Sequence, residues 1–291
     1  MLVARPMLAA LVRRLPVPVA AWLGRRLGDL AWMALARRRR TALDNLAVAF
    51  PELGRAERGR LARRSFQHVG LMSVELCSAL TDPPEATLSR IDVDGLDHLE
   101  RVMATHGRAM LVTAHLGNWE LLSFVHRLTG FPLAIVVRRL DAGWLDAVVR
   151  RLREAASVEI IDKRDAVRPV LAALRRGWMV AILLDQNATR REGVFVPFFG
   201  RAASTSRSVA AIAVRTGTPV VPLFIRRAGD GRHAVTIEEA LVPPRDRASE
   251  EAIAELTAVC ARTIEAAIRR APEQWLWMHA RWRTRPPGER V

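Results

Sequence analysis

The chain has 291 residues, half of them hydrophobic, which excludes a disordered protein and allows one large or two modest domains. Its 45 Lys and Arg against 30 Asp and Glu give a formal net charge of +15, which favours an anionic partner such as nucleic acid, an anionic membrane or an acidic carrier protein. The two cysteines, Cys77 and Cys260, lie far apart in expected helices, so the sequence predicts neither a disulfide framework nor a cysteine metal site.

Residues 1–36 are apolar but interrupted by arginine, proline and aspartate. No run of about 20 apolar residues is left, so a standard membrane-spanning helix is not predicted. A signal peptide is also disfavoured, because an aspartate interrupts the apolar lead-in. Two amphipathic segments remain, Met7–Arg14 and Val17–Ala36, with Trp22 and Trp32 in the second. Tryptophan with basic flanks is typical of a helix lying in the headgroup region of an anionic bilayer; a helical hairpin packed on the main domain is the alternative.

Two further helices are predicted before residue 90. Thr41–Phe50 stops at Pro51, because proline disfavours helix at the residue before it. Ala56–Leu80 follows and ends before a Thr-Asp-Pro-Pro connection. No flexible linker comes next, so residues 1–90 are interpreted as a membrane-associating helical layer on the same structural unit as residues 91–291.

From Ile91 onward, short apolar runs alternate with helical stretches. Such alternation predicts an α/β fold with a central, largely parallel or mixed sheet flanked by helices. A last amphipathic helix and a tail with three tryptophans follow, and the sequence does not separate an interfacial from a core role for these rings. The expected strands are 91–93, 109–113, 133–137, 158–161, 179–184, 220–224 and 234–237, and the expected helices 120–128, 144–155, 165–176, 206–215 and 250–270.

The turn Ala114–Glu120 places His115 and Glu120 between an expected strand and an expected helix, where α/β folds commonly place their chemistry. If the helix begins near Asn118, which suits an N-cap, the turn can bring His115 toward Glu120. A carboxylate that orients an imidazole makes it a better general base. The alternative is a structural histidine beside a surface glutamate.

Two more groups of polar residues follow strands. Asp185 and Gln186 close one strand, and a glycine-bounded aromatic loop, Gly193–Gly200, comes shortly after. Together they could line a cleft with an apolar wall, or serve as a helix cap and a core-covering loop. Arg138 leaves another strand and Arg153 lies in the helix beyond. Arginine at such positions suits phosphate binding, and a solvated charged face is the alternative.

Several common catalytic motifs are missing from the sequence. There is no Gly-x-Ser-x-Gly, no His-Glu-x-x-His, no P-loop and no Gly-x-Gly-x-x-Gly. A covalent serine mechanism, a metal hydrolase and a bound nucleotide cofactor are therefore disfavoured, and no cofactor or metal is expected.

Taken together, these motifs resemble the bacterial lipid A late acyltransferases, the lauroyl and myristoyl transferases of the wider His-x4-Asp/Glu glycerolipid acyltransferase superfamily. The resemblance covers nearly the whole chain. The superfamily's glycerol-phosphate motif, Phe-Pro-Glu-Gly, is replaced by Phe198-Phe199-Gly200, which argues against a glycerol-3-phosphate acyltransferase. The resembling stretches are 38–39, 45–46, 50–52, 114–120, 185–186, 193–200, 216–222 and 272–289.

The resemblance implies acyl transfer from a thioester co-substrate, on acyl carrier protein or coenzyme A, to a hydroxyl of a lipid A precursor, without an acyl-enzyme. It implies that His115 is the general base and that Glu120 orients it. It also implies that Arg138 and Arg153 could engage the phosphorylated glycolipid acceptor, and it leaves the role of Asp185 open. Asn118, Asp185 and Gln186 are further expected substrate-binding residues.

The expected location is the cytoplasmic face of the bacterial inner membrane, bound peripherally or monotopically. The same chemistry on another glycolipid or an aminolipid, from acyl-CoA, is the main alternative. A basic nucleic-acid-binding protein is a remote one, because the arginines are spread along the chain and no binding module is present. An inactive membrane-binding homologue is disfavoured by the intact pair of His115 and Glu120.

Overall fold

The computed structural model describes residues 15–138, 143–243 and 249–289, so the expected segment Met7–Arg14 lies outside the described residues. The described helices are α2 (Val17–Ala34), α3 (Ala36–Ala49), α4 (Arg55–Ala79), α5 (Pro84–Leu88), α6 (Leu96–His106), α7 (Leu122–Val125), α8 (Gly143–Ala155), α9 (Val167–Arg175), α10 (Ser208–Thr216) and α11 (Glu250–Arg270). The strands are β1 (Ile91–Asp94), β2 (Ala109–Thr113), β3 (Leu133–Val137), β4 (Glu159–Asp162), β5 (Met179–Leu183), β6 (Gly193–Phe198), β7 (Arg201–Ser206), β8 (Val220–Gly229) and β9 (Arg232–Ile237).

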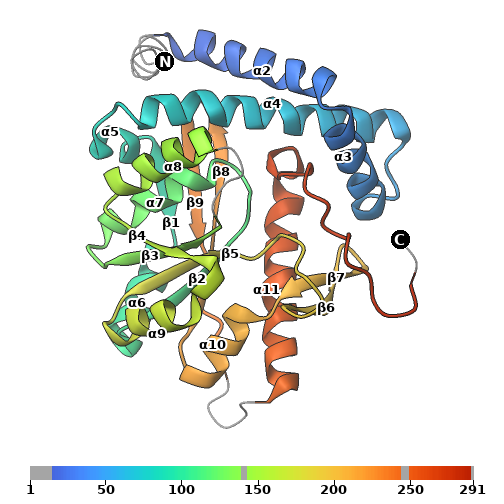
Figure 1. The fold of residues 1–291 in the computed structure, drawn as a ribbon. Helices are drawn as coiled ribbons and strands as arrows, with labels where there is room; N and C mark the ends of the chain where they lie inside the picture. Colours follow the sequence, from blue (N-terminus) through green and yellow to red (C-terminus); the bar gives the residue numbers. More distant parts are fainter. Residues whose placement is uncertain (1–14, 139–142, 244–248, 290–291) are drawn as a thin grey trace.

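Seven strands form one sheet in the order β1-β9-β8-β2-β5-β3-β4 (Figure 1). Every neighbouring pair in this sheet is parallel except β8 and β9, which are antiparallel. The connection between β8 and β9 is a short turn, and only an antiparallel pair can be joined that way. The predicted α/β fold with a largely parallel sheet is confirmed.

Helices bury both faces of the sheet, so the central strands are apolar without interruption. Successive side chains of a strand point to opposite faces. In β2, Met110 and Val112 join a core that includes α9, α10 and α11, whereas Ala109 and Leu111 join a second core with α4, α6 and α8. All five residues of β2 are buried, which places this strand, and the turn that follows it, at the centre of the molecule.

Three segments differ from their prediction. The loop expected at Gly193–Gly200 is half of an antiparallel hairpin, β6–β7, which lies beside α11 (Figure 1). The helix expected at 206–215 begins at Ser208 instead, because Ser206 belongs to β7 and pairs with Gly193 of β6. The helix expected at 120–128 is broken into a 3-10 turn at Trp119–Leu121, the short α7, and a second 3-10 turn at His126–Leu128.

The helix α2 runs along α4 (Figure 1), and glycines bring the two backbones into close contact. A Cβ added to Gly28 would lie 2.3 Å from the Cα of Gln67, and one added to Gly70 would lie 2.1 Å from the carbonyl oxygen of Gly24. Asp29 strengthens this contact by accepting hydrogen bonds of 2.8 Å from both Arg63 and Gln67 on α4. Across the described part of the chain, no helix combines the length and hydrophobicity that a bilayer crossing needs.

A partly buried ion pair joins α4 to the sheet. Glu75 of α4 forms a bidentate ion pair with Arg227 of β8 and lies 3.4 Å from the Nε2 of His233 on β9. Burial by itself raises the pKa of Glu75, but the hydrogen bonds and charges of His233 and Arg227 outweigh burial and lower this pKa from 4.5 to about 2. The carboxylate is therefore charged in the folded protein at any pH above that value.

The close contact of α2 with α4 predicts opposite effects for two Gly→Ala substitutions in helices. Gly28→Ala should lower the free energy of unfolding by about 1–3 kcal/mol, because the new methyl group meets the α4 backbone. Gly59→Ala, in α4, should raise it by about 0.5–1 kcal/mol, because nothing lies within 4 Å of an added Cβ. Urea unfolding followed by tryptophan fluorescence measures both, and equal effects would contradict the described packing.

The lowered pKa of Glu75 predicts a loss of stability in acid. The stabilisation that this carboxylate provides is complete above about pH 4.5 and is lost as the pH falls through about 2, an effect on the order of 3 kcal/mol. Glu75→Gln should be less stable at neutral pH, because the partly buried Arg227 loses its counter-charge. Its free energy of unfolding should also fall less steeply than that of the wild type below about pH 4.5. A parallel pH dependence in the two proteins would contradict this.

Candidate active site

Two turns meet at the carboxyl edge of the sheet because β2 and β5 are parallel neighbours. Thr113, the last residue of β2, pairs with Leu183, the last residue of β5. His115 and Asp185 each follow two residues later, so the strand register brings them together across 70 positions of sequence. The carboxyl ends of parallel strands are where open α/β sheets bind their ligands.

Asp185 holds His115 through two hydrogen bonds. The Nδ1 of His115 lies 2.8 Å from Asp185 Oδ1, and the backbone N–H of His115 donates to Oδ2 at 2.9 Å. On the other side of the ring, the side-chain amide of Gln186 lies 3.1 Å from Nε2. With the Nδ1 proton donated to the carboxylate, Nε2 carries a lone pair and accepts from the amide. The ring is thus oriented with a basic nitrogen on the side away from Asp185.

Asp185 is kept in its charged form by its contacts. Its side chain is 2% exposed, and this burial by itself would raise its pKa. The charge and hydrogen bonds of His115, together with the indole N–H of Trp275 at 2.7 Å, outweigh burial and lower the pKa of Asp185 to about 2. A carboxylate charged at every working pH can stabilise an imidazolium that forms beside it.

Glu120 has other partners than the expected ones. Its carboxylate accepts two hydrogen bonds from Arg153, at 3.0 and 2.9 Å, and one from the indole of Trp119 at 3.2 Å. The carboxylate that orients His115 in this structure is Asp185, so the expectation that the turn folds His115 onto Glu120 as its orienting group is corrected. The cause is the short 3-10 turn after Asn118, from which Glu120 faces α8 and its Arg153. Glu120 stays linked to the site through Trp119, whose ring centre is 5.0 Å from that of His115.

Asn118 and Gly117 shape the turn that carries His115. Asn118 is fully buried and donates from Nδ2 to Glu75 at 3.0 Å rather than capping the following helix. Gly117 has a φ of +59°, and a Cβ added to it would lie 2.2 Å from the carbonyl oxygen of Ile225 on β8. Only glycine fits both conditions. The two residues therefore fix the turn from behind, and the structure does not place Asn118 where a substrate would contact it.

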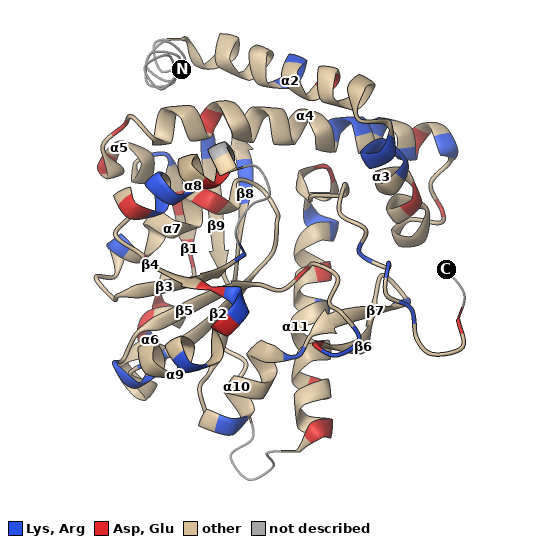
Figure 2. Cartoon of the chain, viewed as in Figure 1, with Lys and Arg blue, Asp and Glu red and all other residues tan. Residues whose placement is uncertain are grey.

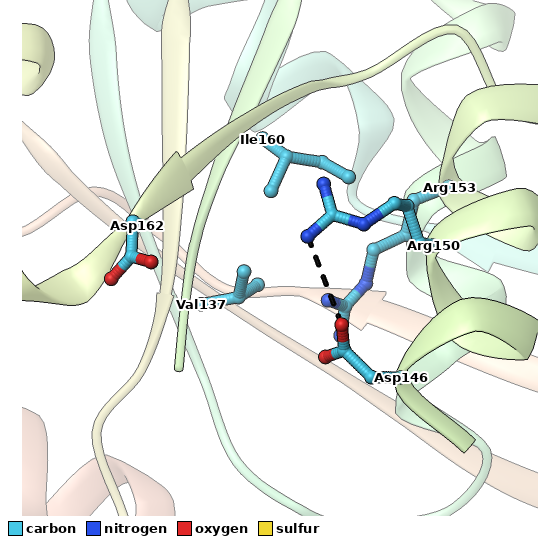
Figure 3. Close-up of a pocket in the computed structure, with 6 residues that line it drawn as sticks. All are labelled: Val137, Asp146, Arg150, Arg153, Ile160 and Asp162. Carbon is cyan, nitrogen blue, oxygen red and sulfur yellow. Dashed lines mark ion pairs between the residues drawn. The ribbon is translucent and has the colours of Figure 1, made fainter. Parts of the chain in front are cut away.

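A pocket of about 160 Å³ is lined in part by Arg153 (Figure 3), whose guanidinium also pairs with Glu120. It opens at the carboxyl ends of β3 and β4, beneath α8, and Arg150 and Arg153 reach into it from that helix. Arg138, the residue after β3, is exposed near this edge. The lining residues are Val137, Asp146, Arg150, Arg153, Ile160 and Asp162.

The C-terminal tryptophans belong to the core, which the sequence did not decide. Trp275, Trp277 and Trp282 are at most 7% exposed and pack with Phe198 and Phe199 of the β6–β7 hairpin. The sequence did not predict that this C-terminal segment contacts the turns that carry His115 and Asp185. The one feature of the sequence that could have indicated a buried role is the density of aromatic residues at 275–282, in an otherwise basic segment.

Comparison with known proteins shows the family of the chain. The family described as bacterial lipid A biosynthesis acyltransferase matches residues 4–284. The lipid A biosynthesis lauroyltransferase of Escherichia coli (strain K12) is 31% identical over 283 residues, which cover 96% of this chain and 90% of that protein. The palmitoleoyltransferase of the same organism is 30% identical, with 95% and 89% covered. Its myristoyltransferase is 25% identical, with 94% and 82% covered. The chain therefore belongs to the bacterial lipid A biosynthesis acyltransferase family and is an acyltransferase.

Proposed function

We propose that this enzyme transfers a fatty acyl chain from a thioester to a hydroxyl group of a lipid A precursor, with His115 as the general base. The observation that carries the proposal is the pairing of His115 with the buried Asp185, in a chain whose relatives are lauroyl-, palmitoleoyl- and myristoyltransferases. Asp185 orients the ring and stabilises its charged form, a role that was expected of Glu120.

The reaction proceeds in one displacement at the thioester carbonyl. The acceptor hydroxyl takes the place of the Gln186 amide at His115 Nε2, and its proton moves to that nitrogen while the oxygen attacks the carbonyl carbon. The carbon–sulfur bond then breaks, and the thiolate takes the proton back from the imidazolium. An ester and a free thiol result, and no acyl group is attached to the enzyme. Asp185 lies on the opposite side of the ring and holds the tautomer throughout.

The polar pocket beside Arg153 is the proposed site for part of the acceptor's head group. Its arginine side chains suit the phosphates of a glycolipid, and its aspartate side chains suit the hydroxyls (Figure 3). Arg153 shares its guanidinium with Glu120, and Arg150 lies 3.8 Å from Asp146. We assign Arg138, Arg150 and Arg153 together to the contact with phosphate. The net charge of +15 also suits an acidic acyl carrier protein as the donor.

We further propose that the outer face of α2 rests on the cytoplasmic surface of the inner membrane. Most of the large exposed apolar residues of the described chain lie in or directly after this helix, including Trp22, Leu30 and Met33, which are 57%, 57% and 62% exposed. Figure 2 shows α2 as mostly uncharged, with basic residues grouped on α3 and the adjoining end of α4. An apolar helix face beside arginines is suited to the headgroup region of an anionic bilayer.

The proposed base predicts that His115→Ala lowers the rate of acyl transfer by roughly 10²–10⁴-fold. Asp185→Asn should also lower kcat strongly, because an amide no longer fixes the Nδ1–H tautomer or stabilises the imidazolium. Purified protein is assayed with a lipid A precursor and with other glycolipid or aminolipid acceptors, each with acyl-carrier-protein and acyl-CoA donors.

Circular dichroism is the control for folding in both variants. Full activity in a folded His115→Ala variant would contradict the assignment of the base. Transfer only to a different acceptor, or only from acyl-CoA, would keep the chemistry and replace the proposed substrate pair.

The membrane proposal predicts the behaviour of a triple variant in which Trp22, Leu30 and Met33 are each changed to serine. This variant should lose most of its binding to vesicles that contain phosphatidylglycerol. Each apolar side chain contributes up to about 1.5–3 kcal/mol when it is buried in the bilayer. A matched control replaces Leu128, Val167 and Val242, which are 45%, 59% and 59% exposed but lie outside α2. Vesicle flotation measures the binding of the two variants. Equal losses of vesicle binding would mean that the membrane contact does not lie on α2.

A further inference from the structure

The chain after α11 runs past both active-site turns and contacts each of them. We call residues 272–285 the strap. Its Leu276 N–H donates to the carbonyl of His115 at 3.1 Å, and the carbonyl of Gln274 accepts from Gly117 N–H at 3.1 Å. These bonds add the strap to the end of β2 as an antiparallel partner, with Leu116 opposite Trp275.

The strap also holds the turn that carries Asp185. The Trp275 indole donates to Asp185 Oδ2 at 2.7 Å. Two residues along the turn, the backbone N–H of Asn187 donates to the Nε2 of His279 at 3.0 Å, and its side chain exchanges two hydrogen bonds with Thr284. The strap is itself anchored on the helical layer, because Asn45 donates to the carbonyls of Trp277 and His279.

We propose that Trp275 and His279 are positioning residues of the acyl-transfer reaction, which set the Asp185 turn at a fixed distance and angle from His115. The inference rests on the proposed role of His115 as the base. By occupying Oδ2, Trp275 leaves Oδ1 in line with the imidazole Nδ1. His279 fixes the backbone on the far side of Gln186, whose amide meets Nε2. One side of the His115 ring thus meets Asp185, which the strap holds directly, and the other side meets Gln186, whose chain neighbour Asn187 the strap holds.

The ring of His279 is suited to accept a hydrogen bond from the backbone N–H of Asn187. Burial lowers the pKa of His279 to about 4, so the ring is neutral under working conditions and its Nε2 can accept a hydrogen bond. The charged or titratable groups that act on Asp185 from the elements around it are His115 from the β2 turn and His279 and Arg281 from the strap. Arg281 is held by the carbonyl of Ser204 and the hydroxyl of Thr205 on β7.

Two neighbouring tryptophans provide a matched test. Trp275 and Trp277 are both buried in the same aromatic cluster, and each donates one indole hydrogen bond. The donor of Trp275 meets Asp185, whereas that of Trp277 meets the backbone carbonyl of Pro272 at 2.6 Å. Changing each to phenylalanine keeps an aromatic ring and removes one bond, so the two variants differ mainly in whether the active-site carboxylate loses a donor.

For Trp275→Phe we expect kcat to fall at least about tenfold with little change in KM, the size expected for one lost hydrogen bond to a charged group. The acid limb of the pH–rate profile should move to higher pH, because a carboxylate with one donor fewer holds the proton of the His115–Asp185 pair more strongly. Trp277→Phe should stay within about twofold of the wild type in kcat and keep its pH profile. Equal losses of kcat in the two variants would show that the strap contributes only packing and would contradict the positioning role of Trp275.

A spectroscopic measurement separates this inference from the proposed function. The Nδ1 proton shared between His115 and Asp185 should give a low-field proton resonance that His115→Ala abolishes. We expect Trp275→Phe to shift this resonance and Trp277→Phe to leave it in place, whichever acceptor the enzyme uses. An unmoved resonance in Trp275→Phe would overturn the positioning role. If the resonance responds to the two substitutions as expected but the wild type transfers no acyl group, the proposed function is overturned instead.

Two substitutions of His279 test its hydrogen bond to Asn187. His279→Gln keeps an acceptor oxygen within reach of the Asn187 N–H, whereas His279→Leu removes the acceptor and keeps a side chain of similar bulk. We expect the glutamine variant to retain most of kcat and the leucine variant to lose about tenfold at unchanged KM. If both variants lose activity equally while remaining folded, the hydrogen bond to Asn187 is not what matters.

Discussion

The parallel pairing of β2 with β5 is the constraint on which the active site depends. It places Thr113 beside Leu183, so the residues two positions beyond each strand must meet at the edge of the sheet. The interior of β2 is fully buried, and helices cover both faces of the sheet. A histidine that leaves such a strand therefore emerges beside a dry core, where a carboxylate keeps its charge only if it is fully hydrogen bonded. Asp185 satisfies this condition through His115 and Trp275.

The second requirement of the site is a turn that cannot relax. Gly117 lies against the β8 backbone, and Asn118 is hydrogen bonded to Glu75, which is in turn paired with Arg227. A partly buried ion pair is weak evidence for stability in itself, since desolvation opposes it. Here it has a geometric consequence, because it ties α4 and β8 to the turn that carries His115. The polar core behind the turn and the strap beside it confine that turn from two directions.

The N-terminal helices share this rigid arrangement. The glycines of α2 and α4 bring the two backbones into contact, and Asp29 adds an ion pair to Arg63. The inner helices α3 and α4 then hold the strap through Asn45 and Ser65, which donate to its backbone carbonyls. The outer face of α2 is thus connected to the active-site turns through packed helices and the strap. A membrane bound at this face would be linked to the site by rigid elements rather than by a flexible tether. Such a connection would hold the site in one orientation toward a membrane.

The sequence by itself determined the α/β alternation, the strand before His115 and the amphipathic character of α2, because periodicity is a local property of the chain. It did not predict the β6–β7 hairpin, since Arg201–Ser206 lacks the apolar alternation of a half-buried strand. Nor could it select the partner of His115. Glu120 is five residues away and Asp185 is 70, yet hydrogen bonds reach the distant carboxylate. Only the order and register of the strands decided between them, because those depend on tertiary packing rather than on spacing along the chain.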